Sequence, residues 1–199
     1  MIMQFISGLA FLRNKASQVS ILVVSFLLIQ GCTSAPASLN YYLLHSTDSM
    51  ALKQSAAKQI IVLDKITLPD YLKHRGLVYQ TSDTNLHIST SHLWAEPVEE
   101  GLTKVLSSAL ADKHISLNRG DQYSKEESAH VSLHIGDFIS TYEGEVVLSG
   151  QYTISSTTDG TSIHPFKFKA SLDSDGFSSS IKAMRNTVAQ LAQHVERNL

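Results

Sequence analysis

The stretch that decides the fold is residues 96–113, Glu-Pro-Val-Glu-Glu-Gly-Leu-Thr-Lys-Val-Leu-Ser-Ser-Ala-Leu-Ala-Asp-Lys. Pro97 and the acidic pair after Val98 suit the entrance of a helix, and Lys113 suits its exit. The pattern predicts an amphipathic helix whose stripe packs on a core, and a groove for a partner is the alternative use of that stripe. The apolar side chains at helical spacing are those of Val98, Leu102, Val105, Leu106, Ala109 and Leu110.

Short strands are predicted on both sides of this helix. They are residues 41–44, 60–68, 76–80 and 86–88 before it and residues 115–117 after it. The run from Ile60 to Leu68 is nearly continuous in apolar residues, so we expect it to be buried on both faces. The unit from Ile88 through the helix to Ile115 is expected to be a right-handed crossover between parallel strands.

The C-terminal part predicts a meander of three strands and a second helix. Alternation slips at Gly136–Asp137, as a β-bulge would cause, and the turns fall at residues 143–144 and 159–160. The last helix is expected from Phe177, with Asp173 and Asp175 making a turn and capping it. Its apolar stripe consists of Ile181, Met184, Val188, Leu191 and Val195. The fold class is therefore α/β, a single domain over residues 40–199 with a mixed β-sheet of roughly six to eight strands and two main amphipathic helices.

The N-terminus has the order of a bacterial lipoprotein signal sequence. Two basic residues, Arg13 and Lys15, precede an apolar segment at residues 19–29, and Gln30-Gly31-Cys32 follows. The apolar segment is shorter than the roughly 20 residues that a spanning helix needs. Residues 1–31 are therefore predicted to be a signal peptide, and Cys32, the only cysteine, the N-acylated and S-diacylglycerol-modified anchor. The alternative is an ordinary secretory signal with a chance cysteine nearby.

Residues 32–39 are predicted to be the acylated cysteine and a short tether. Thr33 stands where an aspartate usually retains enteric lipoproteins in the inner membrane, so the predicted location is the outer membrane, lipid-anchored and facing the periplasm. Residues 33–38 can reach at most about 20 Å when extended. The folded body should therefore lie close to the lipid surface.

Composition excludes several classes of function. Cleavage before Cys32 removes 31 of the 199 residues and leaves 168, which suits one domain. The mature chain has 14 basic and 18 acidic residues, a formal charge of −4, which argues against a nucleic-acid partner. Without a second cysteine it has neither a disulfide nor a thiolate metal site.

The chain lacks the motifs of common enzymes. It has no Gly-x-Ser-x-Gly elbow, His-Glu-x-x-His helix, Walker loop or Gly-x-Gly-x-x-Gly turn, so no catalytic residue and no cofactor is assigned. His130 and His134 lie on a predicted strand about 13 Å apart, too far to share an ion. His87 and His92 are a weaker alternative. Residues 173–176 resemble part of a calcium loop, but a methionine stands where an EF-hand carries its glutamate, so no metal is predicted.

Two stretches combine aromatic residues, prolines and charges, residues 67–80 and 92–97. Pro-Asp-Tyr-Leu at 69–72 is followed by Leu-Val-Tyr at 77–79, and Trp-Ala-Glu-Pro at 94–97 precedes the first helix. In these segments the chain resembles the ABC-type transport auxiliary lipoproteins, most closely their PqiC branch. The likeness runs from the first strand to the last helix.

The resemblance implies a non-enzymatic outer-membrane lipoprotein with a mixed sheet and two main helices. It implies as partners an MCE-domain periplasmic protein and its inner-membrane permease, in a system that moves lipids between the two membranes and supports envelope integrity. The departures from the family are Ile29-Gln30 in the cleavage box and the Ser-rich start of the last helix.

Under such a docking role, the candidate partner-binding or framework residues are Pro69, Asp70, Tyr71, Arg75, Tyr79, Trp94 and Glu96. Core packing is the alternative for Tyr79 and Trp94, because large aromatic side chains are usually mostly buried. Pro69, Asp70 and Tyr71 follow a strand end and are favoured as surface residues. Two other functions stay open, a lipoprotein acting in outer-membrane assembly and, less favoured, a small periplasmic hydrolase. Association into a homo-oligomer also stays open.

Overall fold

The computed structural model describes residues 38–46, 57–120, 128–158 and 160–199. The predicted signal peptide, Cys32, most of the tether and the turn residue Asp159 lie outside the described residues.

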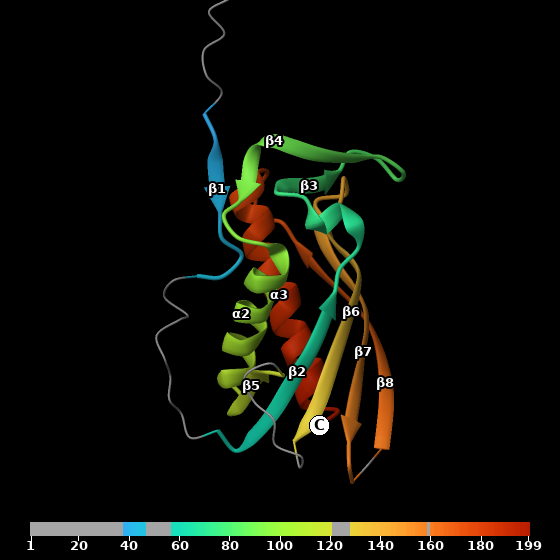
Figure 1. The fold of residues 1–199 in the computed structure, drawn as a ribbon. Coiled ribbons are helices and arrows are strands. Elements are labelled where there is room, and N and C mark those ends of the chain that lie inside the picture. The colour runs from blue at the N-terminus through green and yellow to red at the C-terminus, as the bar shows by residue number, and fades with distance from the viewer. Residues whose placement is uncertain (1–37, 47–56, 121–127, 159) are drawn as a thin grey trace, which may run out of the picture. The chain divides into compact units, whose positions relative to one another are not determined.

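Eight strands form one mixed sheet (Figure 1). They are β1 (Asn40–Tyr42), β2 (Gln59–Thr67), β3 (Gly76–Gln80), β4 (Leu86–Trp94), β5 (Ile115–Arg119), β6 (Ala129–Ser140), β7 (Glu145–Ser156) and β8 (Gly160–Ser171). The strand order is β1-β4-β3-β6-β2-β5, and β7 and β8 continue from the other edge of β6. β2 pairs with residues 129–134 of β6, whereas β3 joins β6 through one pair, Tyr79 with Ser140.

Two α-helices, α2 (Val98–Ala111) and α3 (Phe177–Glu196), lie side by side against the sheet (Figure 1). Their predicted stripes form the core: Leu102, Leu106 and Leu110 of α2 and Val188 and Leu191 of α3 are at most 2% exposed. The sheet contributes the alternate side chains of β6 and β7 to the same core. The α/β mixed sheet with two main amphipathic helices is thus as predicted, and a short 3-10 helix, η2 (Asp70–Lys73), precedes β3.

The meander also follows its sequence pattern. The pairing of β6 with β7 shifts register between Ile135 and Asp137, which confirms the predicted bulge. Gly144 has φ 77° in the β7 entrance turn, a conformation that glycine adopts without steric cost.

The predicted crossover between parallel strands is wrong. β3 runs parallel to β6, β6 to β2 and β2 to β5, whereas β4 is antiparallel to β3. β4 and β5 are therefore antiparallel, and the parallel partner of β5 is β2. The β3–β4 hairpin reverses the chain before α2, and hydrophobic periodicity identifies strands without identifying their partners.

Two local expectations also need correction. β2 is buried on both faces only at residues 61–63, because Asp64 and Lys65 are exposed where the register to β6 shifts. The N-cap of α3 is Gly176 without a side-chain hydrogen bond, and Asp173 instead accepts a hydrogen bond from Lys182 Nζ at 2.5 Å. The Asp173 carboxylate, which the sequence predicts as a cap of α3, is therefore paired with the ammonium group of Lys182 instead.

Candidate docking site

The two sequence segments that combine aromatics, prolines and charges meet at one pocket. It has a volume of about 400 Å³ and lies where η2 and the start of β3 face the junction of β4 with α2. Its apolar wall consists of Leu68, Leu72, Trp94, Ala95, Pro97 and Val98. Its polar rim consists of Lys73, His74, Arg75, Glu96 and Glu99.

Backbone hydrogen bonds fix the end of β4 between its neighbours. The Trp94 amide donates to the Arg75 carbonyl at 2.7 Å, and the Ala95 amide donates to the Tyr42 carbonyl at 2.8 Å. Gly76 permits the close approach, because a Cβ atom there would lie 2.2 Å from the carbonyl oxygen of Ser89. Main-chain contacts therefore hold this part of the pocket wall.

The rim carries both paired and unpaired charges. Lys73 Nζ donates to Asp70 at 2.6 Å, and this hydrogen bond lowers the pKa of the Asp70 carboxyl. The Arg75 guanidinium lies 5.9 Å from the ring centroid of Tyr41, and no carboxylate of the described residues pairs with it. The Glu99 carboxylate has no partner among the described residues either, although its backbone carbonyl accepts from Thr103. Arg75 and Glu99 thus remain available to a ligand.

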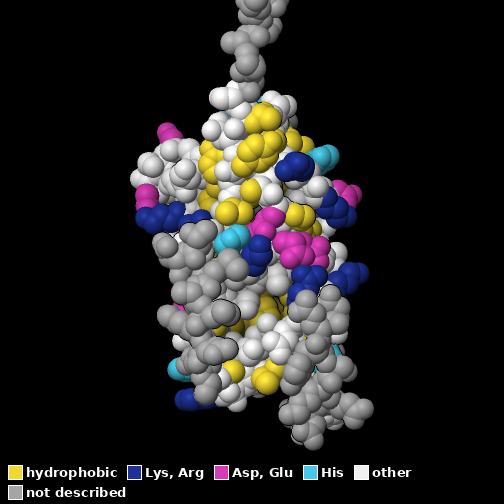
Figure 2. Space-filling model, turned by 60° about the vertical axis from the view of Figure 1, so that its left-hand side comes forward, with side chains coloured by type: hydrophobic (Ala, Val, Ile, Leu, Met, Phe, Trp, Pro, Cys, Tyr) yellow, Lys and Arg dark blue, Asp and Glu magenta, His cyan; other side chains and the backbone are white. Residues whose placement is uncertain are grey.

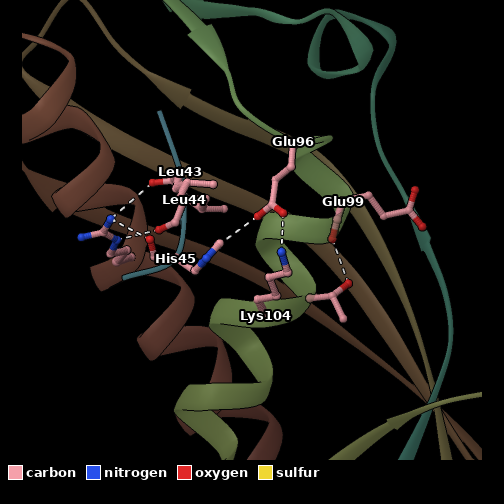
Figure 3. A network of polar contacts seen from close by, with 8 residues as sticks. Leu43, Leu44, His45, Glu96, Glu99 and Lys104 are labelled. Carbon is pink, nitrogen blue, oxygen red and sulfur yellow. Dashed lines mark hydrogen bonds and ion pairs between the residues drawn. The ribbon is translucent and has the colours of Figure 1, made fainter. Parts of the chain in front are cut away.

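Glu96 is instead occupied by the protein itself (Figure 3). One oxygen of its carboxylate lies 2.9 Å from His45 Nδ1, and the other contacts Lys104 Nζ. The side chains of His45 and Glu96 are 7% and 19% exposed. Glu96 therefore connects the segment after β1 to α2, and its role is to hold the pocket wall.

Arg185 of α3 holds the same segment from the other side. Its guanidinium donates to the carbonyl oxygens of Leu44 at 2.6 Å, His45 at 3.1 Å and Leu43 at 3.3 Å (Figure 3). Partial burial lowers the pKa of Arg185. The segment that leaves β1 is consequently fixed to both helices.

The predicted site residues divide into a framework and a surface group. Trp94 is 4% exposed and belongs to the core. The Tyr71 hydroxyl accepts from the Phe138 amide at 3.3 Å, and burial, the main cause, raises the Tyr71 pKa to about 12. Tyr79 packs its ring against His87 and Phe177. The residues left to face solvent around the pocket are Pro69, which is half-buried, and Asp70 and Arg75, which are exposed.

Sequence reasoning missed an aromatic cluster beside β1. The His92 ring lies 4.3 Å from that of Phe177 and 5.7 Å from that of Tyr42, whose hydroxyl is 2.8 Å from His92 Nδ1. These residues come from β4, α3 and β1, so no local spacing links them. His45 and Arg185 were missed for the same reason.

The histidines do not form a metal centre within the described ranges. No group of three histidine, aspartate, glutamate or cysteine side chains there could hold an ion. His130 contacts Asp64 at 2.8 Å, while His134 lies four residues further along β6. Across the same part of the chain, no helix has the length and apolar character needed to cross a membrane.

Comparisons with known proteins agree with this fold. The chain is 28% identical over 185 residues to the intermembrane transport lipoprotein PqiC of Escherichia coli strain K12, covering 89% of this chain and 97% of that protein. The PqiC protein of Shigella flexneri matches to the same extent.

Two solved structures share the fold. One is the crystal structure of an uncharacterized protein, with 24% identity, coverage of 81% of this chain and 98% of that chain, and a TM-score of 0.69. The other, from Xanthomonas campestris, has 11% identity, coverage of 71% and 84%, and a TM-score of 0.57. The family model of the ABC-type transport auxiliary lipoprotein component matches residues 41–196. The chain therefore belongs to the family of ABC-type transport auxiliary lipoprotein components.

Proposed function

We propose that this chain is the outer-membrane lipoprotein subunit of an MCE-type intermembrane lipid transport system and docks the periplasmic MCE component. The family is one of transport auxiliary components and not of enzymes, and the PqiC relatives are named intermembrane transport lipoproteins. The signal-like N-terminus with Cys32 and Thr33 supports the anchor and the outer membrane. Docking is the step that needs a surface, and the pocket supplies one.

The observation that carries the proposal is the meeting of the 67–80 and 92–97 segments at one pocket. Its volume of about 400 Å³ lies within the roughly 300–1,000 Å³ of typical ligand sites. The walls are largely apolar, so a large apolar side chain of the partner suits the interior.

The rim of the pocket indicates which chemical group of the partner lies next to its apolar side chain. Arg75 is exposed and faces no carboxylate of the described residues, so an acidic group beside the apolar side chain would gain a charge-assisted hydrogen bond. Arginine at the edge of an apolar pocket is also a frequent source of binding energy. The partner chemistry is thus an apolar anchor next to a carboxylate.

The first test fills the pocket without touching the core. Ala95→Trp places a large ring on an exposed wall position and keeps the amide that bonds to Tyr42. We expect it to weaken co-purification of the MCE protein about tenfold or more, equivalent to roughly 1.4 kcal/mol. Thr161→Trp, at an exposed position of β8, is the matched control and should bind as the wild type does.

The second test concerns charge. Tyr71→Ala is unsuitable because it removes the acceptor of the Phe138 amide, so Arg75→Glu is preferred. Lys167→Glu reverses an exposed charge on β8 and serves as its control. Should Ala95→Trp and Arg75→Glu both fold and both retain full partner binding, the docking site lies elsewhere.

The genes beside that of this chain test the system itself. Adjacent genes for an MCE-domain protein and a multi-spanning permease are expected. A neighbourhood of outer-membrane assembly genes instead would favour the assembly role and contradict the transport proposal.

A further inference from the structure

Three apolar side chains in and directly beside the first strand are open to solvent. Leu39, Tyr41 and Leu43 are 51%, 54% and 36% exposed. Tyr42 and Leu44 turn the other way, since Tyr42 is half-buried and Leu44 is 1% exposed, while the polar Asn40 is exposed as well. Because successive side chains of an extended chain alternate in direction, the three form one stripe about 13 Å long. We call these three residues the β1 stripe.

The β1 stripe has a basic neighbour and no acidic member. The Arg75 guanidinium lies 5.9 Å from the ring centroid of Tyr41, which pairs in register with the half-buried Leu93 of β4. Figure 2 shows hydrophobic side chains gathered on this face of the molecule, with lysine and arginine side chains beside them and aspartate and glutamate side chains below them. Leucine, tyrosine and arginine together suit the boundary between lipid headgroups and acyl chains, where tyrosine is enriched and arginine reaches the phosphates.

The short length of chain between Cys32 and the β1 stripe favours the lipid surface as the partner of the stripe. Leu39 follows Cys32 by seven residues, a span of at most about 25 Å when extended. A cysteine acylated in the membrane therefore keeps the start of the stripe within that distance of the lipid surface. No partner that diffuses freely is held so close to these side chains.

We propose that the β1 stripe, with Arg75, rests on the phospholipid surface of the membrane that holds the anchor. The proposal depends on the lipid anchor of the proposed function. The stripe would give the domain a second contact, so that the domain has a fixed orientation rather than free rotation on its tether. Because Arg75 belongs both to this contact and to the pocket rim, the same contact fixes the direction in which the pocket opens.

The test uses the full acylated protein in vesicles of phosphatidylethanolamine and phosphatidylglycerol with brominated acyl chains. Trp94, the only native tryptophan, is 4% exposed and supplies a constant background. Tyr41→Trp adds a reporter in the stripe, and Ile163→Trp adds one at a site that is 62% exposed on β8. Strands β4, β3, β6 and β7 separate β8 from β1 in the sheet.

The emission added by Tyr41→Trp should shift to the blue and be largely lost in brominated vesicles, whereas that added by Ile163→Trp should be retained. Adding Leu39→Ser and Leu43→Ser to the Tyr41→Trp variant should restore its emission. Equal quenching of the two reporters, or quenching of neither, would overturn the proposal.

Two further outcomes have separate meanings. A blue shift of the Tyr41→Trp reporter that depends on protein concentration and not on brominated lipid would assign the stripe to a contact between copies, and the proposal would fail. Loss of vesicle flotation by the wild type would instead refute the lipid anchor. Neither the tryptophan emission nor the vesicle flotation depends on partner binding. A failure of the docking proposal would therefore not affect this test of the β1 stripe.

Discussion

His45 Nδ1 lies 2.9 Å from Glu96 Oε1 and so joins the segment after β1 to the residue two positions before α2. The second oxygen of the same carboxylate contacts Lys104, the seventh residue of α2. The network is partly buried, where hydrogen bonds are stronger and an unpaired member is costly. The Glu96 carboxylate is therefore expected to matter for stability more than an exposed acid would.

Glu96→Gln should lower the free energy of unfolding by about 1–3 kcal/mol, because it removes the charge that His45 and Lys104 contact. Urea denaturation followed by circular dichroism measures the loss. Glu99→Gln is the matched control, since that carboxylate has no partner among the described residues, and it should change stability by about 0.5 kcal/mol or less. Equal effects of the two substitutions would show that the network does not stabilise the fold.

Gly150→Ala should destabilise the domain by about 1–3 kcal/mol, as overpacking does. A Cβ atom at Gly150 would lie 2.1 Å from the carbonyl oxygen of His134 on the neighbouring strand. Gly136→Ala is the matched control on β6, because its nearest contacts are at 3.6 Å, and it should cost about 0.5 kcal/mol or less. Thermal melting curves of the two variants measure the difference in stability. Identical curves for Gly150→Ala and Gly136→Ala would contradict the close approach of β6 to β7.

The stability of the domain should fall between pH 10 and pH 12 as tyrosines ionise. Burial raises the pKa of Tyr71 to about 12 and also raises that of Tyr152. A raised tyrosine pKa means that the folded state favours the neutral phenol, so its contribution is complete below about pH 10, the unfolded value, and is lost as pH rises through the folded value. Tyr71→Phe should flatten this alkaline slope in thermal melts. An unchanged slope would place the titration on other groups.

Leu106→Asp should prevent folding or cost several kcal/mol, since it buries an unpaired carboxylate where Leu106 is 2% exposed. That is a large part of the roughly 5–15 kcal/mol that holds such a domain together. Ser107→Asp, at a half-buried position one residue further on, should be milder. A wild-type melting curve for Leu106→Asp would show that α2 does not pack as described.

Cys32→Ser should leave an uncleaved or soluble precursor without lipid, because no other cysteine can carry the thioether. Labelling cells with a fatty-acid analogue, followed by membrane fractionation, measures this. Label retained by the serine variant would refute the lipoprotein assignment.

Elements with a strong period could be predicted from the sequence. The stripes of α2 and α3 and the alternation of β6 and β7 each repeat over many residues, so their buried faces followed directly. The pairing of β5 with β2 could not be predicted, because it depends on which partner is adjacent after the chain reverses.

The sequence predicts which segments form the candidate site, but it does not predict how they are arranged in space. The 67–80 and 92–97 segments were identified by composition, but only the fold shows that they line one pocket. Tyr71 was expected at the surface because it follows a strand end. Its hydroxyl instead reaches the Phe138 amide beside the β6 bulge, a contact across 67 residues that no local pattern encodes.

The clamp of Arg185 on three consecutive carbonyl groups has a mechanical consequence. A protein held by its N-terminus feels any pull first at β1, a strand of three residues paired with β4. Such a force can peel β1 from β4 before it reaches the clamp, because the clamped carbonyl groups of residues 43–45 follow β1 in the chain. Beyond β1, Arg185 passes the load into the 20 residues of α3, the longest helix of the described chain. Under the proposed lipid anchor, traction that separates β1 from the sheet would therefore be stopped at α3 and spread over the core.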